Sequence, residues 1–282
     1  MEISGKVAIV TGAGAGIGAA LARRLAERGA RVVVADLDAD SAATVAESLG
    51  AQAVSVGGDV SDERVIQALI DRAEAEFGPV DLYFANAGIG GGPGLDSTDA
   101  QWSAALEVNV LAHVRAARLL VPGWSARGEG YFVVTASAAG LLTQIGSAPY
   151  SVTKHAAVGF AEWLSVTYGD SGIRVSCVCP MGVDTELLHG DPIPGDEAAA
   201  ALAIKAVTSA GAVLSPRHRA DGAGRVPGRP GRPRRLPAVP RLADRTARAR
   251  DRRGRRQSVT SSAAAVRITS GISTGLRVSE ST

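Results

Sequence analysis

The sequence is poor in cysteine and has no long apolar run. Its only two cysteines, Cys177 and Cys179, alternate in the stretch RVSCVCP, which predicts a strand with both thiols on one face as buried, inert side chains. No uninterrupted apolar run reaches the roughly 18 residues of a membrane span. The N-terminal stretch MEISGKVAIVTG lacks a basic region followed by a long apolar core. These absences favour a cytoplasmic protein with no membrane partner.

Metal ligands are also scarce. The four histidines, His113, His155, His189 and His218, show no ligand spacing, and neither cysteine belongs to a cluster of further ligands. We therefore expect no metal. His155 stands beside Lys154 in the sequence, and we expect its ring to face a helix neighbour or solvent.

The charge is divided unevenly along the chain. The net charge is +2 over 282 residues, yet residues 216–282 contain 17 Arg, no Lys and 4 acidic residues. That stretch carries +13, so the remainder carries −11. With 46% hydrophobic residues, the chain can build a sizeable core. The composition predicts a globular domain over residues 1–215 and an atypical Arg/Pro/Gly-rich tail over residues 216–282.

The first part alternates between short apolar runs and amphipathic stretches. Such alternation predicts an α/β fold of the Rossmann type: a doubly wound parallel sheet between two helical layers, α/β/α. Ligands of such sheets bind at the carboxyl ends of the strands. Strands are expected at residues 6–10, 31–36, 53–59, 81–88, 131–137 and 174–180. Helices are expected at residues 11–29, 41–49, 61–77 with Ser61 as cap, 98–120 and 148–168.

A glycine-rich turn joins the first strand to the first helix. In TGAGAGIG, Gly12, Gly16 and Gly18 permit a tight turn, a close approach of backbone N–H groups to a pyrophosphate, and tight packing of helix on strand. Asp36 follows at the end of the second strand, where its carboxylate can accept ribose hydroxyls and would repel a 2′-phosphate. No Arg or Lys lies in the turn or directly after Asp36. The pattern favours NAD over NADP.

A tyrosine and a lysine are spaced for acid/base chemistry. Tyr150 and Lys154 stand one turn apart on the same face of the expected helix 148–168. A free tyrosine has a pKa of about 10, and a neighbouring ammonium lowers it by favouring the phenolate. Ser137, at the end of the fifth strand, can hydrogen-bond the same substrate oxygen. The spacing alone is weak evidence, because many helices carry Tyr and Lys four residues apart.

Taken together, the motifs resemble the short-chain dehydrogenase/reductase family in its compact, single-domain form. The resemblance covers about residues 1–188 and rests on the order and spacing of all the motifs. It implies Tyr150 as acid/base, Lys154 lowering its pKa and holding the nicotinamide ribose, Ser137 steadying the substrate oxygen, and Asn109 holding a relay water. The cofactor-binding residues it implies are Thr11, Gly12, Gly16, Ile17, Gly18, Asp36, Leu37, Asp59, Val60, Asn86, Ala87, Gly88, Tyr150, Lys154, Pro180, Val183 and Thr185.

The expected activity is hydride transfer between NAD and a secondary alcohol or ketone. The candidate pocket residues Leu141, Leu142, Ile145 and Met181 suggest a hydrophobic substrate, and residues 196–211 read as a helix in the mobile substrate lid of the family. Met181 departs from the family pattern, which has Gly after the proline. The family also implies a homodimer held by the helices at residues 98–120 and 148–168.

The tail departs most from the family. It has no aromatic residue and six of the 13 Pro, so disorder is expected, together with a sheet that ends at six strands and leaves an exposed edge. One interpretation is a natural basic tail that binds nucleic acid or an acidic surface, although no aromatics are there to stack on bases. The favoured one is an out-of-frame reading of a GC-rich gene. Two alternative functions remain. The chain binds the cofactor but is a catalytically inactive relative, or it is a nucleic-acid-associated protein that acts through its basic tail.

Overall fold

The computed structural model describes residues 1–183, 185, 187 and 267–269. Its centre is a parallel sheet in the order β3-β2-β1-β4-β5-β6-β7. The chain runs outward from β1 to β3, returns to the other side of β1, and continues from β4 to β7. The predicted doubly wound α/β fold is confirmed. The order reverses between β1 and β4, which is where ligands of such sheets bind.

The strands lie close to the predicted positions. Each of the first six is within three residues of its expected end, because buried runs of Val, Ile and Ala mark strands covered on both faces. Their bounds are β1 Val7–Thr11, β2 Arg31–Asp36, β3 Ala53–Gly57, β4 Leu82–Ala85, β5 Gly130–Thr135 and β6 Ile173–Val178.

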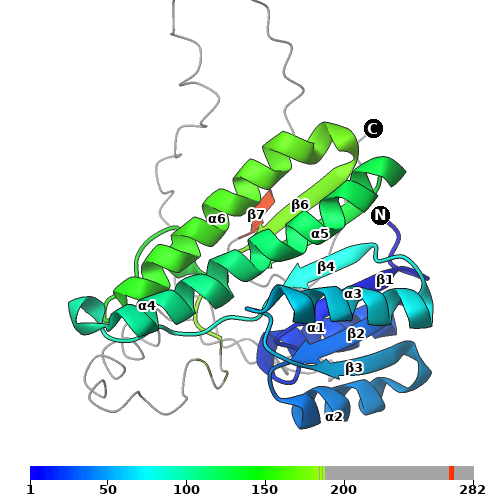
Figure 1. Ribbon diagram of the computed structural model, residues 1–282, viewed down its shortest axis with the longest axis horizontal. Helices are drawn as coiled ribbons and strands as arrows, with labels where there is room; N and C mark the ends of the chain where they lie inside the picture. The colour runs from blue at the N-terminus through cyan, green and yellow to red at the C-terminus, as the bar shows by residue number, and fades with distance from the viewer. Residues whose placement is uncertain (184, 186, 188–266, 270–282) are drawn as a thin grey trace, which may run out of the picture. The chain divides into compact units, whose positions relative to one another are not determined.

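Helices cover both faces of the sheet. Figure 1 shows α3, α5 and α6 side by side over one face, where they bury a core with Trp124, Phe132 and Ile66. Helices α1 and α2 pack on the other face over β1 and β2. The α-helices are α1 Gly16–Glu27, α2 Ala39–Leu49, α3 Glu63–Phe77, α4 Asp99–Leu106, α5 Ala112–Arg127 and α6 Ala148–Tyr168.

The expected helix at residues 98–120 is interrupted and longer. A π-helical segment, Glu107–Leu111, separates α4 from α5, and α5 continues past Pro122 to Arg127. The continuation is stabilised by Trp124, which is buried and donates its indole N–H to Val80 O at 2.8 Å. Tertiary packing therefore outweighs the helix-breaking tendency of proline at this position.

The cap of α3 also differs from the expectation. Asp62, not Ser61, is the N-cap residue, and its carboxylate accepts the N–H of Arg64 at 2.9 Å. Ser61 lies one residue earlier, and its own N–H donates to Asp59 Oδ1 at 2.9 Å. Both residue types are good caps, so their order in the sequence could not decide between them.

The sequence predicted a sheet that ends at six strands, but the structure has a seventh strand. Strand β7, Arg267–Thr269, pairs in parallel with β6, with Ile268 opposite Cys177. The stretch VRIT supplies β-branched residues suited to a strand. Other predictions for residues 216–282, and the lid helix at 196–211, lie outside the described residues.

Candidate active site

A hydrogen-bond network joins the carboxyl ends of β1 and β4. The Thr11 hydroxyl donates to Phe84 O at 3.1 Å and accepts the N–H groups of Asn86 and Ala87 at 3.0 and 3.1 Å. The Asn86 amide in turn donates to Thr11 O and Gly12 O. Thr11, Asn86 and Ala87 thus hold the glycine-rich turn against the end of β4.

The turn itself leaves no room for side chains. At Gly12, with φ +61°, an added Cβ would lie 2.8 Å from Ala87 Cα, and at Gly18 it would collide with Gly12 O. Helix α1 begins at Gly16 without a side-chain cap and with no acidic residue in its first turn. Its unpaired N–H groups and positive dipole end suit a pyrophosphate. The chain therefore fits a dinucleotide at this turn.

Asp36 is fixed at the edge of the turn. Its carboxylate accepts the N–H of Gly14 at 2.8 Å through one oxygen and the N–H of Asp38 at 3.1 Å through the other. Leu37, next to it, is 75% exposed. The carboxylate thus stands at the carboxyl end of β2, where a ribose bound across the turn would lie.

The other predicted nucleotide residues lie beyond the ends of β3 and β4 and at the start of α1. Asp59 follows β3 by two residues, while Val60 is buried. Ile17, in the first turn of α1, is half-buried.

Tyr150 and Lys154 lie together on α6, as the spacing predicted. The Lys154 ammonium is 5.5 Å from the centre of the Tyr150 ring and donates to Thr135 O at 3.0 Å. Lys154 is only 2% exposed, and this burial lowers its pKa to about 8. A buried lysine with so low a pKa, next to a tyrosine, is a typical catalytic environment.

The pKa of Tyr150 differs from the expectation. Burial raises the pKa of its phenol, and a hydrogen bond with Ser137 opposes that rise. The lowering of this pKa by Lys154, which the spacing predicts, is not found: the ammonium donates to Thr135 O, and desolvation of the phenolate is the largest effect on the phenol.

Ser137 follows β5 by two residues and is held by the turn that it begins. Its hydroxyl accepts the N–H of Ala139 at 3.1 Å, which orients the side chain at the start of a 3₁₀ turn, Ala138–Gly140. Ala138 N–H donates to Pro180 O at 2.8 Å. The end of β6 therefore supports the serine that faces Tyr150.

Asn109 lies in the π-helical segment and is fully buried. Its amide N–H groups donate to Ile89 O and Thr153 Oγ1 at 2.9 and 3.0 Å, and its oxygen accepts Ile89 N–H at 2.9 Å. A Cβ at Gly88 would lie 3.1 Å from both Asn109 Oδ1 and Lys154 Nζ. Both side-chain donors are occupied, so a relay water would have to use an Asn109 oxygen.

The turn after β6 approaches the glycine-rich turn. Pro180 and Val183 are buried. A Cβ at Gly16 would lie 3.1 Å from the methyl group of Thr185, whose hydroxyl donates to Val183 O at 3.3 Å. Met181 is 38% exposed, so its side chain is accommodated outside the core.

Sequence reasoning missed three residues of the site. Thr135 accepts the Lys154 ammonium through its backbone oxygen, Thr153 links Asn109 to α6, and His113 is buried one turn after Asn109. Helical spacing could have indicated His113, which is four residues from Asn109. A backbone acceptor such as that of Thr135 leaves no signal in the sequence.

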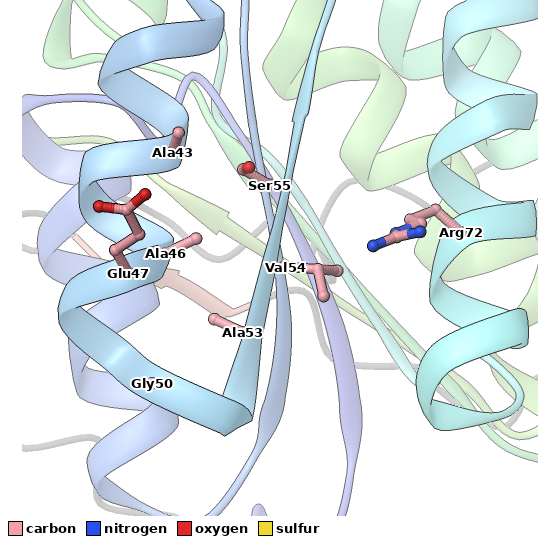
Figure 2. A pocket seen from close by; sticks show the side chains of 8 residues that line it. All are labelled: Ala43, Ala46, Glu47, Gly50, Ala53, Val54, Ser55 and Arg72. Atoms are coloured by element: carbon pink, nitrogen blue, oxygen red, sulfur yellow. The ribbon is translucent and has the colours of Figure 1, made fainter.

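The structure also has a hollow of about 370 Å³ away from this site. Figure 2 shows Ala43, Ala46 and Glu47 of α2 on one side of the edge strand β3, with Arg72 of α3 on the other. None of the predicted site residues lines it, and its few polar groups do not converge. We assign it no function. Among the described residues no three His, Cys, Asp or Glu side chains gather as metal ligands, and no helix is long and apolar enough to cross a membrane.

Comparison with known families gives one match over most of the chain. The sequence profile of the family described as "short chain dehydrogenase" matches residues 6–192. Similar curated proteins include cis-4-hydroxycyclohexanecarboxylate dehydrogenase of Sinomonas cyclohexanicum, 41% identical over 66% of this chain and 77% of that protein. They also include (+)-borneol dehydrogenase 1 of Salvia officinalis, 37% identical over 67% and 74% of the two chains.

Solved structures agree with the sequence comparison. A short chain dehydrogenase/reductase from Burkholderia phymatum, solved in complex with NAD, is 32% identical, with a TM-score of 0.69 over 76% of this chain and 83% of that chain. A 3-ketoacyl-(acyl-carrier-protein) reductase from Brucella melitensis, complexed with NADH, is 30% identical, with a TM-score of 0.67 over 76% and 87%.

Proposed function

This chain belongs to the short-chain dehydrogenase family and is an oxidoreductase of CH–OH groups; from that premise we propose that it interconverts a secondary alcohol and a ketone with NAD, using Tyr150 as acid/base. The observation that carries the proposal is the grouping of Tyr150, Ser137 and the buried Lys154 at the carboxyl end of the sheet.

Each residue has a separate task in the reaction. NAD, when bound, accepts or supplies the hydride. Tyr150 takes the hydroxyl proton during oxidation or gives it to the ketone oxygen during reduction, while Ser137 donates a hydrogen bond to that oxygen. Lys154 supplies positive charge beside the phenol. Because the pKa of Tyr150 is raised by burial, the fraction of phenolate that can accept a proton grows as pH rises, so alcohol oxidation should become faster with increasing pH.

NAD rather than NADP is the proposed cofactor because of Asp36. Its carboxylate, held by Gly14 and Asp38, can accept ribose hydroxyls and would repel a 2′-phosphate. No described basic side chain hydrogen-bonds or ion-pairs with Asp36. NAD or NADH is present in both related structures named above.

The proposed substrate is a secondary alcohol or ketone on a hydrophobic body. Leu141, Leu142 and Ile145 lie exposed on the segment between Ser137 and α6, and Met181 is exposed after β6. These segments adjoin Ser137, Tyr150 and the end of β6 in the chain. The names of the relatives, which mention hydroxycyclohexanecarboxylate, borneol and a 7alpha-hydroxysteroid, fit such a substrate. A panel of neutral alicyclic alcohols against short polar alcohols tests this point, and faster turnover of the polar set would contradict it.

We also propose a homodimer through α5 and α6. Trp163 and Val166 on α6 are 53% and 72% exposed, which leaves apolar surface for a second copy. Sedimentation velocity should give a dimer for the full chain and a monomer for Val166→Asp; a monomeric wild type would contradict this proposal. A cytoplasmic location stays a prediction.

The direct test of the chemistry is Tyr150→Phe. We expect turnover of any accepted alcohol to fall at least about 100-fold, because the proton acceptor is lost, while NADH binding is kept. Tyr168→Phe, at the far end of the same helix, is the matched control and should retain turnover. Unchanged turnover in Tyr150→Phe would contradict the assigned role. A wild type that binds NADH but turns over no alcohol or ketone would favour the inactive-relative alternative.

A further inference from the structure

His113 is a buried polar residue that the proposed mechanism does not use. It lies in α5, four residues after Asn109, and is 2% exposed. Within the described part of the chain, neither its Nδ1 nor its Nε2 has a hydrogen-bond partner. A neutral imidazole has one donor and one acceptor nitrogen, and leaving both unpaired in the interior is costly. Such groups in folded proteins are usually paired with internal water.

His113 lies close enough to Lys154 for the lysine charge to act on its ring. Asn109 and His113 are one helical turn apart and so lie on the same side of the segment formed by the π-helix and α5. Asn109 reaches Thr153, the neighbour of Lys154 on α6. The charge of Lys154 also acts on His113: burial, and then that charge, lower the pKa of the imidazole to about 3. The ring is therefore neutral wherever the enzyme works.

Lys154 has hydrogen-bonding capacity to spare. An ammonium carries three donors, and its one protein acceptor in the described residues is Thr135 O. Asn109 has both side-chain donors occupied but keeps acceptor capacity on its oxygens. A water near these groups could accept from the lysine, donate to an Asn109 oxygen and meet the imidazole.

We propose that His113 is a positioning residue that binds a buried water, and that this water extends the hydrogen-bonded path from Lys154 and Asn109. The neutral ring holds the water through its donor or acceptor nitrogen and takes no proton itself. The proton that Tyr150 receives from an alcohol can then leave through hydrogen-bonded water, and the path stays aligned because the ring is fixed in the core. The effect of His113 on kcat rests on the proposed function, whereas the buried water site does not.

The test compares two variants of similar size in the full-length protein. In His113→Leu the water loses its anchor, so we expect kcat for alcohol oxidation to fall about tenfold while KM for NAD changes less than about twofold. His113→Gln keeps a donor and an acceptor and should recover most of the wild-type kcat. His155→Leu, an exposed change on α6, is the matched control and should leave kcat unchanged. Equal kcat in the wild type and His113→Leu would overturn the positioning role.

Two measurements decide the water site without turnover. If the ring were dry, His113→Leu would remove an unpaired polar group and raise Tm; we expect an unchanged or lower Tm. A crystal structure of the wild type should show a water within about 3.2 Å of a His113 ring nitrogen. A higher Tm for His113→Leu, or a dry ring in the crystal, would overturn the inference even if the dehydrogenase activity is found. If no alcohol is turned over, the proposed function fails, and these two results still decide the water site.

Discussion

Lys154 sits in an environment that costs stability. The ammonium is buried beneath Gly88 and Thr135, and its pKa falls from 10.5 to about 8. A shift of that size corresponds to about 3 kcal/mol of unfavourable charge burial at neutral pH. The chain keeps this charge next to Tyr150, where a nucleotide and a phenol can use it.

The prediction is that Lys154→Met stabilises the protein without cofactor. At pH 7 we expect the free energy of unfolding to rise by about 1–2 kcal/mol, because relief of desolvation is partly offset by the lost hydrogen bond to Thr135 O. Urea unfolding of the wild type and of Lys154→Met measures this difference in the free energy of unfolding. NADH affinity and turnover should fall in the same variant.

The pH dependence gives an independent check on Lys154. Between pH 8 and 10.5 the unfolded chain still binds the lysine proton and the folded chain does not, so wild-type stability should gain from this group as pH rises. Below pH 8 both states are protonated and the full penalty applies. Lys154→Met should lack this gain. Parallel stability curves for the two proteins would contradict the buried charge.

For single residues, the sequence predicted that Tyr150 and Lys154 lie together. It did not predict how their surroundings change the pKa of Tyr150. The spacing of Tyr150 and Lys154 placed them on one helix face, as observed. The raised pKa of Tyr150 could not be predicted, because it depends on how far the folded chain desolvates the phenol. His113 has no motif around it, and its unpaired nitrogens appear only in three dimensions.

Among the elements, the turn between β1 and α1 carries the most specific packing requirement. Gly12 and Gly50 have similar positive φ angles, +61° and +63°, but a Cβ at Gly50 would meet nothing within 4 Å. A Cβ at Gly12 would lie 2.8 Å from Ala87 Cα. Gly50 therefore serves as a control for a positive φ without a close contact.

We predict that Gly12→Ala destabilises the protein more than Gly50→Ala. Both variants place a side chain at a positive φ, which costs on the order of 1–3 kcal/mol. Gly12→Ala should cost at least about 1 kcal/mol more, because Ala87 and the turn must move apart. Urea unfolding measures the difference, and NADH titration should show weaker binding in Gly12→Ala only. Equal losses in both would mean that the close contact with Ala87 is unimportant.

The bounds of elements were predictable where local patterns are strong. Helix α6 has the predicted bounds, Ala148–Tyr168, and β2 coincides with the run RVVVAD. The π-helical segment around Asn109 and the passage of α5 beyond Pro122 were not predicted. Both depend on contacts with Ile89, Thr153 and Val80, which come from elsewhere in the chain.

Over the whole molecule, the sequence predicted a doubly wound parallel sheet with helices on both faces, as observed. It did not predict β7, because a three-residue pairing from an arginine-rich stretch has no periodic pattern to announce it. The predicted site lies almost entirely before residue 188, in the part that the family profile covers. The catalytic proposal therefore depends on residues 1–187 being able to bind a nucleotide in the presence of the tail.

Titration of the full-length protein with NADH and NADPH, followed by nicotinamide fluorescence, tests the central claim most directly. Every step proposed for Tyr150, Ser137 and Lys154 requires a nucleotide bound at the glycine-rich turn, with Asp36 at the ribose. We predict saturable binding of NADH that is at least about tenfold tighter than that of NADPH. Failure of a folded sample to bind either nucleotide would contradict the account.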